Sequence, residues 1–423
     1  MSAIRTTLVA LVVVVAGCAD LRPFQCETDG QCGDGGRCEE SGACSFAAPE
    51  CHAARRYGDR GESGLAGACV GDETIRAAAI AAGSEHTCAR DAGGAVWCWG
   101  SNAEGGLAQR DLDRSEAPRE IPEVHGATDL DGGEFHTCAV ADGRVWCWGA
   151  GERGQLGRGK SGDDATPETI ALDGVVDVDL GEHHSCARTS GGAVWCWGRN
   201  EECESGQAGG NDVTSPRQVD IPPAKAIAIG GNHGCALADD GSVRCWGRNN
   251  HGQLGRGDAN NFQAPSVIAG FAGAVGLALG GDHTCAWFAD GTVRCAGFNQ
   301  FGQIGDNTTA DRKSPVAVPA MTDVVELTAI DHATCARRKD GKVVCWGEGA
   351  AGALGAGNAN RPQPGDPVPL PGPAAQLTAG ELHACALTED GCAWCWGSDG
   401  SGQLGAGPGN DSGGVRPVLL ACP

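Results

Sequence analysis

Between residues 75 and 423, apolar residues occur in short runs separated by Gly, Asp and Pro, and the same order of runs returns several times. Each unit begins with an apolar stretch that ends in Gly, such as "AIAAG", followed by a His, a Cys and a short apolar segment. A turn such as "DAGG" or "DDG" leads to a second segment that ends in "CWG", and then to a Gly-rich loop, a Pro and a final apolar pair. Short apolar runs between turn residues are typical of β-strands, and the pattern predicts about four strands per unit.

The units repeat with a period of about fifty residues. The first cysteine of each unit recurs at intervals of 48–50 residues, at Cys88, Cys138, Cys186, Cys235, Cys285, Cys335 and Cys385. Seven units of four short strands predict an all-β fold, a seven-bladed β-propeller.

Each unit carries a second cysteine nine or ten residues after the first, across a predicted hairpin. If Cys235 lies opposite Cys245, the turn is Asp239–Gly241, a common three-residue loop with Gly where φ must be positive. In the second unit Cys138 and Cys147 are one residue closer, and the same pairing leaves the two-residue turn Asp142-Gly143. The loop shortens and the cysteines still face each other, as directly opposed cross-strand partners require.

We therefore predict a disulfide in every hairpin, with buried free thiols as the alternative. The spacing is too wide for the close cysteine pairs of structural zinc sites. The predicted disulfides join Cys88 to Cys98, Cys138 to Cys147, Cys186 to Cys196, Cys235 to Cys245, Cys285 to Cys295, Cys335 to Cys345 and Cys385 to Cys395.

The second strand of the first hairpin has two apolar faces, with Val96 and Cys98 on one and Trp97 and Trp99 on the other. Blades of a propeller stack face to face and cover both faces. We therefore predict that the tryptophans form the core between blades; the alternative is an exposed aromatic ligand site.

The first residues have the pattern of an export signal. Arg5 precedes an apolar run at residues 8–16, which is short for a membrane span. The following "VAGC" at residues 15–18 resembles a bacterial lipoprotein box, in which the chain is cut before the cysteine and a lipid is attached there. This resemblance implies a signal peptide at residues 1–17 and a lipid on Cys18 that anchors the protein to a membrane surface. The alternative is an ordinary cleaved signal with Cys18 paired elsewhere.

Residues 18–70 are predicted to hold the anchor and a small disulfide-rich module, ahead of a propeller at residues 71–423. We interpret the module as a spacer, with a separate binding module as the alternative, and the sequence does not choose the cysteine pairing. The module's cysteines are Cys26, Cys32, Cys38, Cys44, Cys51 and Cys69. Cys392 and Cys422 both lie in the last unit and can pair with each other, which would leave Cys203 as a free or an intermolecular thiol.

The units resemble those of the regulator of chromosome condensation repeat family. The matching motifs are "G-x-x-H-x-C-A" at residues 83–89, "D-G-x-V-x-C-W-G" at residues 240–247 and "G-Q-L-G" at residues 252–255. They recur in register over about 350 residues. The resemblance implies a seven-bladed propeller that binds other proteins.

Three units depart from the family pattern. The fifth has Ala296 in place of the Trp, and the sixth has Ile330 where Gly is expected and a His332 shifted by one position. The third replaces the "GQLG" loop by "EECESGQAGG". These departures leave the local geometry of the three units open.

Composition narrows the function further. The chain has 54 acidic and 31 basic residues, a net charge of -23, which argues against nucleic acid as a partner because phosphate binding needs clustered Lys and Arg. Its 24 cysteines indicate an oxidising compartment. We find no nucleophile elbow, phosphate loop or zinc-protease motif, and we expect no cofactor and no enzymatic activity.

Six units place a His two residues before the first cysteine. A ring of imidazoles is a candidate metal site, but we favour a repeated structural His that bonds a buried carbonyl, and we predict no metal. These residues are His86, His136, His184, His233, His283 and His383. The acidic pairs Asp129/Asp131 and Asp177/Asp179 fit strand ends at least as well as a calcium site.

Together these features predict a non-enzymatic protein-binding scaffold of the cell envelope. We expect a monomer that is held by the lipid on Cys18, at the outer membrane, or released outside the cell, and that binds a protein not identified by the sequence. The alternatives are an inhibitor of a secreted enzyme, similar to β-lactamase inhibitor protein II, a guanine nucleotide exchange factor like the family's eukaryotic namesake, and a glycan-processing enzyme. The export signal and the disulfides oppose the exchange factor. The lack of paired carboxylates in a shared loop pattern opposes the enzyme.

Overall fold

The computed structural model describes residues 37–38, 44–47, 55–57, 76–110, 112–260, 263–407 and 412–418. The chain divides into two compact units, Met1–Pro49 with Ala54–Val70 and Glu50–Ala53 with Gly71–Pro423. In the first unit, β1 (Arg37–Cys38), β2 (Cys44–Ala47) and β3 (Arg55–Tyr57) form an antiparallel sheet in that order. Its backbone register places Cys38 opposite Cys44. The predicted lipid site Cys18 lies outside the described residues, as do Cys26, Cys32, Cys51 and Cys69.

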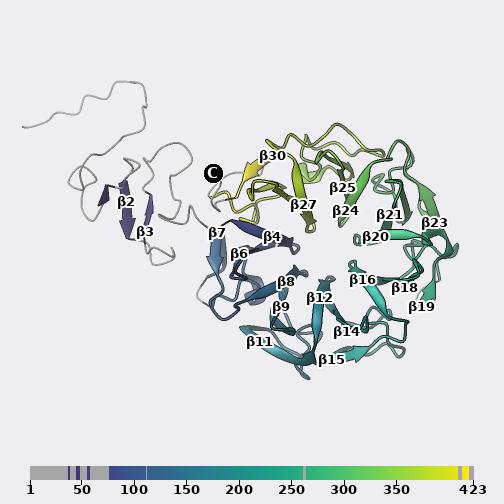
Figure 1. Ribbon diagram of the computed structural model, residues 1–423, viewed down its shortest axis with the longest axis horizontal. Helices are drawn as coiled ribbons and strands as arrows, with labels where there is room; N and C mark the ends of the chain where they lie inside the picture. Colours follow the sequence, from purple (N-terminus) through teal and green to yellow (C-terminus); the bar gives the residue numbers. More distant parts are fainter. Residues whose placement is uncertain are drawn as a thin grey trace, which may run out of the picture. The chain divides into compact units, whose positions relative to one another are not determined.

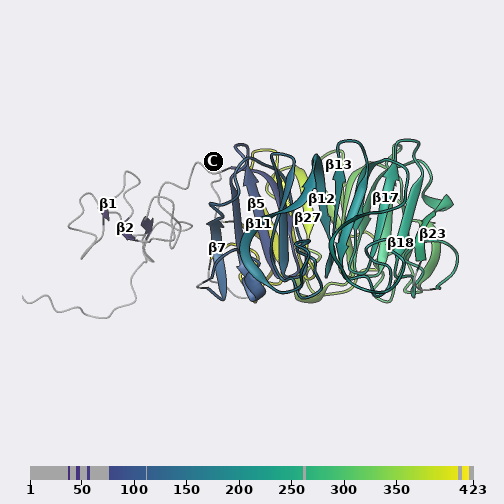
Figure 2. The same ribbon diagram turned by 90° about the horizontal axis from the view of Figure 1, so that it is seen from below.

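The second unit is a ring of seven antiparallel sheets around a central axis (Figure 1). Within each sheet the strands follow one another in sequence, from the axis outward. Figure 2 shows this ring edge-on, with the loops at its two faces. The seven-bladed β-propeller predicted by the repeats is confirmed. In the part of the chain that the structure describes, no helix is long and apolar enough to cross a membrane.

The blades are numbered from the N-terminal end. Blade 1 holds β4 (Ala77–Ala82), β5 (His86–Asp91), β6 (Val96–Ser101) and β7 (Arg114–Glu120); blade 2 holds β8 (Ala127–Gly132), β9 (His136–Ala141), β10 (Arg144–Gly149) and β11 (Asp164–Asp173); blade 3 holds β12 (Val175–Leu180), β13 (His184–Thr189), β14 (Val194–Gly198) and β15 (Val213–Gln218); blade 4 holds β16 (Ala224–Ile229), β17 (His233–Ala238), β18 (Val243–Gly247) and β19 (Gln263–Val267); blade 5 holds β20 (Ala274–Leu279), β21 (His283–Phe288), β22 (Val293–Gly297) and β23 (Arg312–Ala317); blade 6 holds β24 (Val324–Ile330), β25 (Ala333–Arg338) and β26 (Val343–Gly347); and blade 7 holds β27 (Ala374–Ala379), β28 (His383–Thr388), β29 (Ala393–Gly397) and β30 (Ser412–Pro417). Three short 3₁₀ turns complete the described elements: η3 (Ala103–Gly105), η4 (Ala269–Phe271) and η5 (Ala350–Gly352).

Blade 6 has three strands, so the prediction of four is wrong for this unit. Beyond β26, pairing is limited to two isolated bridges, between Val344 and Pro367 and between Gly347 and Arg361. The segment at residues 361–373 reads "RPQPGDPVPLPGP". Proline has no backbone N–H to donate to a strand ladder, which explains why a fourth strand does not form here.

The hairpin registers agree with the sequence-based prediction. Cys235 lies opposite Cys245, and Gly241 closes the turn with a φ of 77°. In blade 2, Cys138 lies opposite Cys147, and the two-residue turn has positive φ at both Asp142 and Gly143.

Every blade contains a disulfide between the two central strands. The structure has all seven links given above, with Cα–Cα distances of 4.1–4.2 Å and cysteines that are 0–1% exposed. Cys392 is also in a disulfide, and Cys422, its predicted partner, lies outside the described residues.

The core consists of seven apolar clusters, each shared by two neighbouring blades of the described propeller. In six of them the "CWG" tryptophan is completely buried, as Trp99 is between blades 7 and 1. Ala296 occupies this position in the cluster between blades 4 and 5. There the fully buried Phe271, from η4, packs in the same cluster and supplies the missing aromatic ring.

The repeated histidines connect successive blades. Each imidazole is 0–1% exposed, and in five of the six its Nε2 lies 2.7–2.9 Å from the hydroxyl of a Thr or Ser in the next blade. In blade 2 that hydroxyl, on Thr137, donates in turn to the carbonyl of Gly106, so its oxygen accepts the Nε2 proton of His86. For this nitrogen the predicted bond to a carbonyl is indirect, because the Thr137 hydroxyl lies between the ring and the carbonyl of Gly106. Burial lowers the pKa of His86 to about 4, which keeps the ring neutral.

Two blade junctions lack this contact. His184 faces Gly234, which has no hydroxyl, and its Nε2 has no hydrogen-bond partner among the described residues. A Cβ at Gly234 would collide with the Trp246 ring in its present position, so a side chain there requires the ring to move. At the junction of blades 6 and 7 both partners are replaced, by Ala333 and Ala384. Replacing both hydrogen-bond partners by apolar residues costs little stability, whereas leaving one polar group buried without a partner is destabilising.

We expect His136→Ala to destabilise the propeller more than His184→Ala, by about 1–3 kcal/mol. Both substitutions remove the same buried ring, but only His136 donates to a hydroxyl, that of Ser185. Urea unfolding of the two oxidised variants, followed by tryptophan fluorescence, measures the difference. Equal losses of stability would contradict the role assigned to the histidine–hydroxyl contact.

The ring closes through side chains. The hydroxyl of Thr87 in blade 1 lies 2.8 Å from Nε2 of His383 in blade 7. The Gln376 side chain accepts from the N–H of Ile80 at 3.1 Å and donates to its carbonyl at 3.0 Å. Figure 1 shows β4 and β27 side by side at this junction. Among the described strands, those of each blade come from one continuous segment, and none of them is exchanged between blades 1 and 7.

Candidate functional site: an acidic mouth on the loop face

Each blade contributes two loops to one face of the ring, which we call the loop face. One loop joins the first strand to the second, and the other follows the third strand. The hairpin turn between the second and third strands lies at the opposite face, as β17 shows: it begins at His233 beside the loop face and ends next to the Asp239–Gly241 turn. Rigid strands therefore hold fourteen loops on one side.

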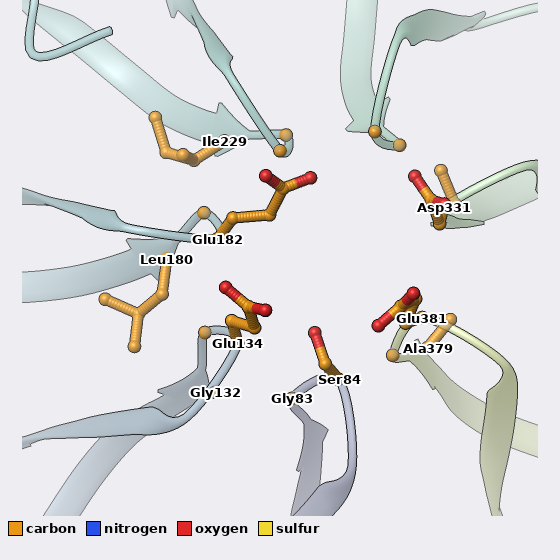
Figure 3. A pocket seen from close by; sticks show the side chains of 18 of the residues that line it. Gly83, Ser84, Gly132, Glu134, Leu180, Glu182, Ile229, Asp331, Ala379 and Glu381 are labelled. Atoms are coloured by element: carbon orange, nitrogen blue, oxygen red, sulfur yellow. The ribbon is translucent and has the colours of Figure 1, made fainter. Parts of the chain in front are cut away.

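The axial channel opens on the loop face through a hollow of about 170 Å³, which we call the acidic mouth. Figure 3 shows four carboxylates, those of Glu134, Glu182, Asp331 and Glu381, and the Ser84 hydroxyl directed into it. Each of these residues stands at the same position of its unit, directly after the residue that ends the first strand region. The repeat thus brings together side chains that are about fifty residues apart in the chain.

Blades 4 and 5 place glycine at the equivalent position. A Cβ at Gly231 would collide with the carboxylate of Glu182, and a Cβ at Gly281 with that of Asp331. The two glycines therefore make room for the carboxylates of neighbouring blades.

The mouth is negatively charged and only partly neutralised. Glu134 pairs with Nδ1 of His183 at 2.9 Å, and Glu182 accepts from the Asn232 side chain at 3.1 Å. Burial, followed by the charge of Asp331, raises the pKa of both Glu182 and Glu381. The hydrogen bond to Glu134 raises the pKa of His183 against the effect of burial. Carboxylates crowded in a concave site raise one another's pKa and attract cationic groups.

Below the mouth, the channel continues as a hollow of about 260 Å³ that shares one lining residue from each blade with it. Here the acidic pairs noted in the sequence connect the inner strands of blades 2 to 4. Asp129 accepts the N–H of Val178 at 2.9 Å, and Asp131 accepts that of Leu180 at 2.8 Å. Burial raises the pKa of Asp129 to about 6 and that of Asp131 to about 8. These two carboxyl groups of blade 2 therefore have a structural role, because they bond to the backbone of blade 3.

The other candidate residues from the sequence analysis, Cys203 and the repeated histidines, do not come together in one site. Cys203 is the free cysteine of the described residues; burial and the charge of Glu204 raise its pKa, so the thiol is protonated at neutral pH. It has a φ of 63° at a position where the other six blades have a glycine of positive φ. The buried histidines bond neighbouring blades, and within the described ranges no group of three or more His, Cys, Asp or Glu residues has the geometry of a metal site.

A ring of seven blades around an acidic axial channel defines the protein as a seven-bladed β-propeller with one loop-rich face. Two family models, both described as "Regulator of chromosome condensation (RCC1) repeat", together match residues 77–140, 142–207, 224–303 and 374–403, more than half of the chain. The chain therefore belongs to the RCC1 repeat family. The matches leave out residues 304–373, which include blade 6 with its shifted His332.

Several solved structures have a similar fold. Prp20p from Saccharomyces cerevisiae, studied for its binding to Gsp1p and histones, is 23% identical with a TM-score of 0.65, over 72% of this chain and 80% of that one. Human WBSCR16 is 21% identical with a TM-score of 0.69, over 75% and 88%. Yeast RCC1 (Prp20) bound to Kap60 is 20% identical with a TM-score of 0.66, over 89% and 94%. A comparison with curated protein sequences finds no match.

Proposed function

We propose that this protein is a non-enzymatic binding scaffold of the cell envelope, which captures a partner protein on its loop face. The export signal and the lipoprotein box at Cys18 support a location outside the cytoplasm. Seven buried disulfides support an oxidising compartment, because cytosolic thiols are kept reduced. RCC1-type propellers commonly bind other proteins, which supports a binding role.

The observation that carries the proposal is the contrast between buried and loop positions within one chain. The cysteines and most of the tryptophans and histidines repeat from blade to blade and are buried. The loop position three residues after the glycine of the "CWG" strand, by contrast, holds five different residue types in the seven blades and is at least partly exposed. It holds Ala103, Glu152, Glu201, Asn250, Gln300, Ala350 and Gly400. A rigid frame that presents varied loops on one face suits the recognition of another macromolecule.

Photo-crosslinking in growing cells tests this function. We expect a photoreactive amino acid at Glu152 or at Gln300, both exposed on the loop face, to give the same covalent protein adduct, identified by mass spectrometry. The matched control places it at Asp240, which is exposed in a hairpin turn on the opposite face. The absence of a protein adduct from both loop positions, or an equal yield of the same adduct from Asp240, would refute a loop-face scaffold.

A further inference from the structure

Two histidines and two phenylalanines of blades 4 to 6 meet on the loop face in a group that we call the Phe–His cluster. The centroid of the Phe298 ring lies 4.7 Å from that of His251, 6.0 Å from that of Phe301 and 5.3 Å from that of His332. The Phe301 and His332 rings are 5.1 Å apart. His251, Phe301 and His332 are all half-buried, so one side of the cluster faces solvent.

The cluster is built where the repeat departs from its own pattern. Phe298 follows the glycine that ends the third strand, a position that holds Arg199 in blade 3 and Arg248 in blade 4. In blade 6, Ala333 takes the place of the buried histidine, and the preceding His332 lies outside the blade junction. The fold does not need these rings for the contacts between blades, because the other blades make those contacts without them.

Carboxylates surround the cluster. Asp311 lies 2.9 Å from Nδ1 of His251, and Asp331 and Glu348 lie 2.9 Å and 3.3 Å from Nδ1 of His332. Asp331 also lines the acidic mouth, so the cluster and the mouth are continuous.

The charge on this side of the loop face is not balanced by Arg or Lys. In blades 3 and 4, Arg199 and Arg248 pair with the loop carboxylates of Glu201 and Glu202. Among the described residues, the ion pairs of Asp311, Asp331 and Glu348 are with histidines. Partly buried aromatic rings, beside carboxylates that pair with histidines and not with Arg or Lys, thus mark blades 4 to 6.

We propose that the Phe–His cluster and its carboxylates form the docking surface for a segment of the partner protein that carries Arg or Lys. Aromatic faces and edges supply apolar contact and attract cations, and carboxylates bind guanidinium and ammonium groups. Aromatic anchors surrounded by polar groups are typical of the energetic centre of an interface. The inference rests on the proposed function and names the chemistry of the partner that the loop face selects.

The test uses the full-length exported protein and a fluorescein-labelled peptide of alternating Gly and Arg, with Glu in place of Arg in the control peptide. We expect the Arg peptide to bind, as measured by fluorescence anisotropy, and the Glu peptide not to bind. The double substitution Asp311→Asn and Glu348→Gln is expected to weaken Arg-peptide binding by about tenfold. Phe301→Ser is expected to weaken it as well, without a change in net charge.

The matched control also removes two negative charges, but from the opposite face, by Asp240→Asn and Asp290→Asn in exposed hairpin turns. Less than about a twofold effect of this control supports the proposal. If both double variants weaken Arg-peptide binding equally, binding depends on the net charge of the protein and not on this surface, and the proposal is overturned. Self-association of the wild-type protein that Phe301→Ser abolishes would also overturn it, because the surface would then bind a second copy. If the docking surface is refuted, the crosslinked adducts at Glu152 and Gln300 are still expected. Failure of the docking surface can therefore be distinguished from failure of the proposed loop-face scaffold.

Discussion

Reduction of the seven hairpin disulfides is expected to abolish the folded propeller. Each disulfide closes a loop of 9 or 10 residues, which is worth about 2–3 kcal/mol through the restricted unfolded chain. The net stability of an ordinary domain is about 5–15 kcal/mol, so the combined loss exceeds what the fold can sustain. We therefore expect the fully reduced and alkylated protein to remain unfolded in buffer, as measured by tryptophan fluorescence and circular dichroism.

The same reduction is expected to be slow for the native protein. The bonded cysteines are 0–1% exposed, so a thiol reductant reaches them only after a blade has opened. We expect neither the reductant alone nor moderate urea alone to unfold the oxidised protein. Both together should unfold it at the same urea concentration. As a control, Cys235→Ala with Cys245→Ala removes one disulfide and should lower stability by about 2–3 kcal/mol without preventing folding. A reduced, fully alkylated protein with the native spectrum would contradict this account.

The second large effect is a gain of stability, expected for Asp131→Asn at neutral and alkaline pH. Burial raises the pKa of Asp131 to about 8, from 3.8 in the unfolded chain. Below pH 4 the carboxyl is protonated in both states and contributes no pH dependence. Between pH 4 and 8 the unfolded chain loses its proton first, so this group lowers the stability of the wild-type protein as the pH rises.

Asparagine removes this cost and keeps the contact, because its side-chain oxygen accepts the Leu180 N–H as the carboxylate does. Asp131 also lines the hollow of the channel and is only partly buried, which reduces the effect. We expect a gain of about 2–4 kcal/mol at pH 8 and little change at pH 4, measured by urea unfolding at both values. Asp240→Asn, in an exposed turn, is the control and should give no gain. A wild-type protein that becomes more stable from pH 4 to pH 8 relative to Asp131→Asn would contradict the assigned protonation.

The repeated architecture could be predicted from the sequence because it depends on local rules. Strand periodicity and turn length fix which residues of a hairpin face each other, so the pairing of Cys138 with Cys147 follows from one change in loop length. Analogy with the other units predicted a fourth strand in blade 6, and this strand is absent because the prolines of the segment lack the N–H groups of a ladder.

The candidate site was harder to find in the sequence because its residues differ between units. The mouth combines Ser84, Glu134, Glu182, Asp331 and Glu381, and no motif connects them until the ring places them around one axis. A comparison of the same position in all seven units would have shown four acidic residues out of seven. Two members of the Phe–His cluster, Phe298 and His332, stand where the repeat departs from its own pattern, and the sequence marks such a position only as irregular.

The central claim, an exported propeller held by a disulfide in each blade, is tested most directly by a non-reducing peptide mass map of the protein isolated from its native cells. We predict a lipid on Cys18 and a link between Cys88 and Cys98, with the six equivalent links in the other blades. Free thiols at these positions, together with a retained Met1, would place the protein in a reducing compartment and contradict the account.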